Sequence, residues 1–92
     1  MNAIVINRLK RQVIRDLASA MADLPEGHQF ILSQSENLIT LADFARFSPG
    51  TNNHEIMKIW IKKPNAEFDP IQFANDAEIM LSMIKSKMKV AA

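Results

Sequence analysis

Arg8, Arg11 and Arg15 are the residues whose type and spacing most clearly suit a binding chemistry. They recur at intervals of three and four, so they share one face if this segment is helical. A planar guanidinium matches phosphate and carboxylate groups with paired hydrogen bonds. We interpret the three arginines as a surface that contacts phosphates or a carboxylate-rich partner. The alternative is a solvated stripe beside the buried face of the same helix.

Lys58, Trp60 and Lys62 form a second candidate surface. Alternate residues of a strand share a face, which would place the indole between two ammonium groups. Such a face suits stacking on an unpaired base, with flanking phosphate contacts. The size of Trp60 favours another interpretation, in which it belongs to the core of a small domain and lysine stems line its edge.

Few residues could carry catalysis or hold a metal. The candidates are His28, His54, Ser33, Ser35, Asp69 and Asp76. The histidines lack a metal-type spacing, and the serines lack a nearby base. Two glycines and no cysteine exclude a glycine-rich phosphate loop and a thiolate site. We therefore expect a protein that is not an enzyme, with no catalytic residue, no metal, no cofactor and no small-molecule substrate.

The charges of this chain nearly cancel, yet they are segregated along the sequence. The formal net charge is +1, from 11 basic and 10 acidic residues. Residues 1–15 contain four basic residues and no acid, whereas residues 16–55 contain six acids against Arg46. This segregation predicts a binding protein with basic and acidic faces. The near-zero net charge separately argues against a protein that coats nucleic acid indiscriminately.

The size and composition of the chain are typical of one soluble domain. Its 92 residues, of which 48% are hydrophobic, predict a single domain over residues 1–92. No run approaches the roughly 18 apolar residues that span a bilayer. We expect a cytoplasmic protein with no membrane partner.

The two ends of the chain predict amphipathic helices. In the first, Ile6, Leu9, Val13, Leu17 and Met21 recur at helical spacing, and the turn-forming residues 23–27 end the segment. The second helix is predicted over residues 70–89. Its apolar face consists of Phe73, Ala77, Met80, Leu81, Ile84 and Met88.

The start of the second helix carries several N-terminal signals. Asp69 precedes Pro70, the typical order of an N-cap and the first helical position. Gln72 has the spacing of a capping box, and Phe68 and Phe73 have that of a hydrophobic staple. Acids early in this helix and lysines at its end suit the helix dipole.

The middle of the chain predicts strands. Residues 30–32 and 38–41 are apolar runs that flank a polar group, which indicates a hairpin. Residues 56–62 favour a strand, although a helix capped by Asn53 also fits, and Thr40 could likewise cap a helix over residues 41–47. The sequence therefore predicts an α+β fold of order α-β-β-β-α, with both helices packed on a short antiparallel sheet.

The segments Glu36–Phe47 and Ile56–Lys62 resemble the KilA-N domain of phages and large DNA viruses. The shared features are a leucine/isoleucine–threonine–aspartate–alanine segment and a later segment of tryptophan and basic residues. The threonine–glutamate segment that usually follows the tryptophan in that family is missing here. This resemblance implies a DNA-binding regulator of a phage, which is the alternative function.

As a whole, the chain resembles the small phage-encoded anti-CRISPR proteins, which are compact single domains of this length without active sites. The resemblance lies in overall character, because the class shares no motif. It implies a non-catalytic inhibitor of a type I-F complex in the bacterial cytoplasm. Its partner would be a host multisubunit nucleoprotein of Cas proteins and guide RNA, and its action would block target DNA binding. The simplest other possibility is a structural module whose basic residues serve solubility.

Overall fold

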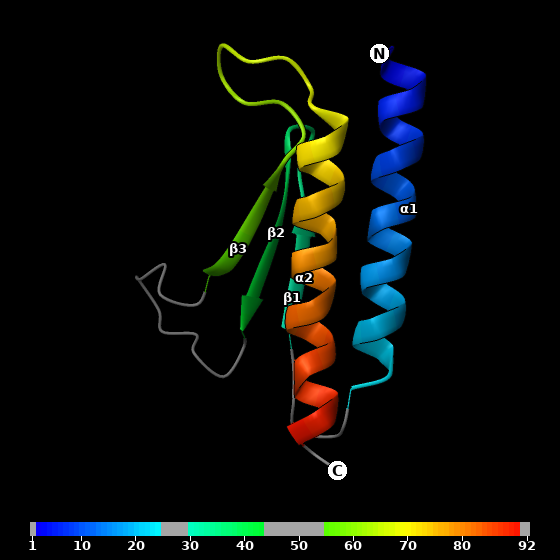
Figure 1. The fold of residues 1–92 in the computed structure, drawn as a ribbon, viewed down its shortest axis with the longest axis vertical. Helices are drawn as coiled ribbons and strands as arrows, with labels where there is room; N and C mark the ends of the chain where they lie inside the picture. The colour runs from blue at the N-terminus through cyan, green and yellow to red at the C-terminus, as the bar shows by residue number, and fades with distance from the viewer. Residues whose placement is uncertain (1, 25–29, 44–54, 91–92) are drawn as a thin grey trace.

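The computed structural model places two helices on one face of a three-stranded antiparallel sheet (Figure 1). It describes residues 2–24, 30–43 and 55–90, with side chains up to residue 87. The elements are α1 (Ala3–Ala22), β1 (Phe30–Gln34), β2 (Leu38–Asp43), β3 (Glu55–Trp60) and α2 (Pro70–Val90). The predicted α+β fold of order α-β-β-β-α is confirmed.

Some of the sequence predictions concern residues outside this description. They are the turn after residue 24, His28, Phe44–Phe47 of the KilA-N-like segment, the candidate cap Asn53, His54, and the side chains of Met88 and Lys89.

Helix α1 begins at an asparagine cap and buries the predicted apolar face. The side-chain oxygen of Asn2 accepts a hydrogen bond of 3.0 Å from the backbone N–H of Val5, which satisfies one of the free donors of the first turn. Leu17 is buried, and Val13 packs against the core from the preceding turn. The apolar spacing in this segment therefore identified the inward side of the helix correctly.

Helix α2 begins as its sequence signals predict, with one difference. The Asp69 carboxylate accepts hydrogen bonds from the backbone N–H groups of Ile71 and Gln72 at 3.0 and 3.2 Å. The rings of Phe68 and Phe73 lie 5.4 Å apart, as expected for a staple. The capping-box prediction for Gln72 is wrong for its side chain, since its amide donates instead to Asp76, one turn onward, at 2.8 Å.

The sheet has the order β1-β2-β3, and its middle strand supplies most of the buried sheet residues. Residues 55–60 form a strand, so the strand interpretation of this segment is confirmed and the helix interpretation is wrong. Residues 41–43 belong to β2, which excludes a helix that starts at Leu41. The register shifts between Leu41 and Ala42, where the β2–β3 ladder is irregular.

The core lies between the helices and one face of the sheet. Six side chains are almost fully buried there: Leu17, Ile39, Leu41, Ile59, Met80 and Ile84. Because strand residues alternate between faces, the neighbours of these sheet residues point the other way. Among the described elements, both helices lie on the core side and neither covers the opposite face (Figure 1).

Helices α1 and α2 run side by side in the same direction within their layer (Figure 1). Neither α1 nor α2, the two helices of the described chain, combines the length and apolar character that crossing a bilayer requires. Their amphipathic faces instead position the candidate site described next.

Candidate functional site

The side chains of Arg8, Arg11 and Arg15 are exposed on the outer side of α1, opposite the face that carries Leu17. We call these three residues the arginine surface. They border a shallow hollow of about 310 Å³. Its lining residues are Ile4, Asn7, Arg8, Arg11, Gln12 and Arg15. The helical spacing of the arginines therefore places them on one surface, as predicted.

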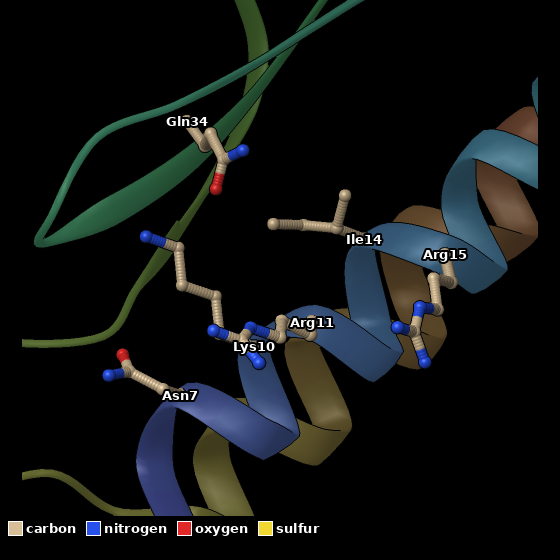
Figure 2. A pocket seen from close by; sticks show the side chains of 6 residues that line it. All are labelled: Asn7, Lys10, Arg11, Ile14, Arg15 and Gln34. Atoms are coloured by element: carbon tan, nitrogen blue, oxygen red, sulfur yellow. The ribbon is translucent and has the colours of Figure 1, made fainter. Parts of the chain in front are cut away.

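A second hollow, of about 390 Å³, lies between α1 and the end of β1 (Figure 2). Its lining residues are Asn7, Lys10, Arg11, Ile14, Arg15 and Gln34. Lys10 and Ile14 extend toward the sheet, and the amide oxygen of Gln34 points toward Lys10 (Figure 2). Arg11 and Arg15 line both hollows, so an anion in either one would lie near their guanidinium groups.

Lys10 is a basic residue that already has a hydrogen-bond partner within the protein. Its ammonium group donates a hydrogen bond of 2.7 Å to the backbone carbonyl of Ser35, 25 residues away in the chain. This contact joins α1 to the segment after β1 and forms one wall of the second hollow. Lys10 therefore supports the shape of the site, while its charge is partly satisfied within the protein.

The arginine surface differs because its charges have no ion-pair partner in the part of the chain that the structure describes. Within residues 2–24, 30–43 and 55–87, no carboxylate lies within 4.0 Å of Arg8, Arg11 or Arg15, and no hydrogen bond holds their guanidinium groups. The nearby Asp16 carboxylate accepts instead from the amide of Gln12 at 3.0 Å. Three adjacent, solvated guanidinium groups can thus bind an external anion without first breaking an internal ion pair.

Trp60 does not belong to the core, so that interpretation is wrong. Its side chain is 36% exposed, whereas Ile59 is fully buried and Ile61 nearly so. Strand alternation explains this result, because turning Ile59 and Ile61 toward the helices turns Trp60 to the open face. Trp60 lies opposite Leu38 of β2 in the ladder. We call the open side of the sheet around Trp60 the tryptophan face.

The two lysines predicted beside Trp60 have different surroundings. Lys58 is exposed but lies 3.4 Å from the carboxylate of Glu55 on the same strand. Lys62 is exposed just beyond β3, and its backbone N–H donates to the carbonyl of Asn37 at 3.1 Å. The structure therefore bears out only part of the predicted alternation: Lys58 and Trp60 lie on β3, where the Lys58 charge already has a partner, and Lys62 lies beyond the strand.

The six residues predicted to bind a partner do not form one surface. The arginine surface lies on the outside of the helix layer, and Trp60 lies on the side of the sheet that faces away from the helices. Lys62 borders a third hollow, of about 570 Å³, which shares Asn7 with the two hollows beside the arginine surface. Its polar lining includes Asn7, Glu36, Asn37, Lys62 and Glu67.

Several residues that line the hollows beside the arginine surface were not predicted from the sequence, among them Asn7 and Gln34. Asn7 lies one helical turn before Arg11, so its place could have been read from the helical spacing. Gln34 reaches the site only through the packing of β1 beside α1, and no local sequence pattern indicates that contact.

The described residues contain no group of three or more histidine, cysteine, aspartate or glutamate side chains that could hold a metal ion. Asp69 caps α2, and Asp76 accepts from Gln72, so both carboxylates have structural partners.

Comparison with known proteins gives no relative: no family model, no curated protein and no solved structure matches the chain.

Proposed function

We propose that this protein is a non-catalytic inhibitor that binds a host CRISPR ribonucleoprotein of the type I-F kind and blocks its binding of target DNA. The arginine surface would contact guide-RNA phosphates at a place where RNA and Cas protein are both exposed. The observation that supports this proposal most strongly is the set of three guanidinium groups on one exposed helix face that have no ion-pair partner among the described residues.

The spacing of the arginines fits a phosphate backbone. Arg8 and Arg15 are separated by about 10 Å along the helix axis, with Arg11 between them. Each guanidinium can form two parallel hydrogen bonds with one phosphate. Contacts of this type position a protein on a nucleic acid without reading its sequence. They therefore suit an inhibitor that must act whatever the sequence of the guide RNA.

A composite partner fits better than free nucleic acid. The net charge of the chain is only +1, and acidic residues are numerous outside the arginine surface. Those acids would repel a long polyanion that wrapped the whole molecule. A partner that presents phosphates beside basic protein surface matches both signs of charge, and the overall resemblance to small anti-CRISPR proteins supplies the proposed class of target.

The test is a binding experiment with purified type I-F surveillance complex. We expect the protein to bind the intact complex, and target duplex DNA to be excluded from the protein-bound complex. The isolated guide RNA and free duplex DNA should bind far more weakly. Equal binding to complexes with different guide sequences would support the phosphate-contact mechanism.

Two outcomes would contradict this proposal. Failure to bind or inhibit the complex, together with failure to protect phage in bacteria that carry the system, would exclude the inhibitor function. Tight binding to free duplex DNA that falls steeply with salt would instead favour a DNA-binding regulator of the KilA-N kind.

A further inference from the structure

We propose that the outer face of α2 pairs with the same face of a second copy of this chain, with the two helices antiparallel. The residues that carry this inference lie on α2, so it does not rest on the arginine surface or on the proposed function. Failure of either proposal would leave the other intact.

The outer face of α2 exposes large apolar side chains. Ile71 is 73% exposed and Ile79 is 50% exposed, although the opposite side of the same helix forms part of the core. A broad hollow of about 710 Å³ runs along this face. Its lining residues are Asn75, Glu78, Ile79, Ser82, Met83 and Ser86. Ile79 lines this hollow and Ile71 is exposed near the start of the same helix; exposed apolar side chains of this kind are typical of an interaction surface.

The spacing on this face fits a helix–helix seam. Asn75, Ile79, Ser82 and Ser86 follow one another at intervals of four, three and four, the repeat of two packed helices. The two serines are small, which allows a second helix to approach closely. In antiparallel pairing about the point between Leu81 and Ser82, Ile79 of one copy would lie between Ser82 and Ser86 of the other.

The order of charges along α2 identifies the occupant. Glu78 and Lys85 are both exposed, and neither has an ion-pair partner within the described part of the chain. Seven residues separate them, about 10 Å along the axis, which is too far for a pair within one helix. Two antiparallel copies bring each glutamate opposite the other copy's lysine. The midpoint between Glu78 and Lys85 lies between Leu81 and Ser82, and the midpoint between Asp76 and Lys87 lies at the same position.

This arrangement is complementary to itself only in the antiparallel direction. A twofold axis near residues 81 and 82 pairs acid with base twice at the flank of the seam, as an isologous interface requires. A parallel pair would align Glu78 with Glu78 and Lys85 with Lys85, which is repulsive. A second copy of α2 is therefore a partner whose apolar spacing and charge order both match this face.

The first test uses the absence of cysteine from the chain. In the antiparallel pair, residue 82 lies beside its own symmetry copy, whereas the two copies of residue 86 are about 14 Å apart along the axis. A disulfide requires Cα atoms within about 7 Å. We expect Ser82→Cys to form a covalent dimer on mild oxidation and Ser86→Cys to remain mostly monomeric. Equal crosslinking of both variants indicates a parallel pair, and no crosslinking of Ser82→Cys excludes the seam; either result overturns the proposal.

The second test measures self-association by sedimentation equilibrium. The unmodified chain should reach twice its 10.4 kDa mass. Glu78→Lys and Lys85→Glu should each raise the dissociation constant about tenfold, since two ion pairs become repulsive contacts. The double variant should return to within about threefold of the original. The controls Glu36→Lys and Lys63→Glu change the same charges at exposed sites outside α2.

Three results would overturn the dimer. They are a chain that stays monomeric at its highest soluble concentration, a dimer that neither single reversal weakens, and a double variant that does not recover. Thermal unfolding of each variant at low concentration separates weakened association from loss of fold.

Discussion

The arginine surface and the tryptophan face differ in whether their basic groups already have a partner within the described residues. Arg8, Arg11 and Arg15 share the outer side of α1, and Lys58 lies with Trp60 on the exposed side of β3. On α1 the three guanidinium groups have no partner within the described residues, whereas on β3 the Lys58 ammonium lies 3.4 Å from Glu55. An anion that binds Lys58 must therefore replace its ion pair with Glu55, although an exposed pair of this kind contributes little to stability.

The two surfaces also differ in position. The arginine surface lies outside the helix layer and the tryptophan face outside the sheet, with the core between them. A flat partner can cover only one of them. The residues predicted as one site therefore lie on two surfaces that one flat partner cannot contact together. Variants of each surface can show which of the two binds the partner.

The largest effect is expected from residues that hold the two layers together. Ile59 is fully buried and Ile31, on the tryptophan face, is 39% exposed. Replacing Ile59 with alanine should lower the free energy of unfolding by about 3 kcal/mol, because it leaves a cavity. Ile31→Ala, the matched control, should cost about 1 kcal/mol. Urea unfolding measures both, and equal losses would contradict an open sheet face.

The next largest effect concerns partner binding. Reversing Arg8, Arg11 and Arg15 to glutamate should weaken binding to the surveillance complex about a hundredfold, since three phosphate contacts become repulsive. The matched reversal of Lys58, Lys62 and Lys63 should change the affinity by less than about threefold. A larger loss in the lysine variant would move the site to β3 and the residues just beyond it.

Replacing the three arginines with lysines tests the chemistry of the contact. The charge is retained, but the paired hydrogen bonds of guanidinium are lost. We expect affinity to fall about tenfold, between the original protein and the glutamate variant. An unchanged affinity would mean that charge alone is recognised.

Lys10 should show a smaller effect, because it shapes the second hollow rather than presenting a free charge. Lys10→Met keeps the apolar stem and removes the hydrogen bond to Ser35. We expect a loss of about 0.5 kcal/mol in stability and about threefold in affinity. Unfolding and binding measured on the same preparation would separate the loss of stability from the loss of affinity. A loss of affinity as large as that of the arginine variants would indicate that Lys10 contacts the partner directly.

The smallest effect is expected for Trp60. Trp60→Ala should leave the affinity within about twofold, whereas loss of a base stacked on the indole would cost about 1–3 kcal/mol. A tenfold loss would establish the tryptophan face as a second contact with nucleic acid.

Local patterns were enough to predict much of the fold. The cap and staple at the start of α2 depend on residues close in sequence, and the structure contains both. The β-branched and aromatic residues of 56–62 favoured a strand, and residues 55–60 form one, with Ile59 fully buried on its inner face.

The remaining features depend on contacts between distant segments. Trp60 was assigned to the core from its size, but the two layers bury only one face of the sheet, and the β3 register turns Trp60 to the other. The Lys10–Ser35 contact and the place of Gln34 arise from the packing of α1 beside β1, which no local spacing encodes.

The salt dependence of binding tests the central claim most directly, namely that the arginine surface contacts phosphates. The affinity for the surveillance complex would be measured over a range of salt concentrations for the original protein, for Arg8, Arg11 and Arg15 all replaced by glutamine, and for Trp60→Ala. Each lost phosphate contact reduces the slope of log affinity against log salt by about 0.7–0.9. We therefore expect the slope to fall by about two to three in the glutamine variant and to stay unchanged in Trp60→Ala. An unchanged slope in the glutamine variant would contradict the account.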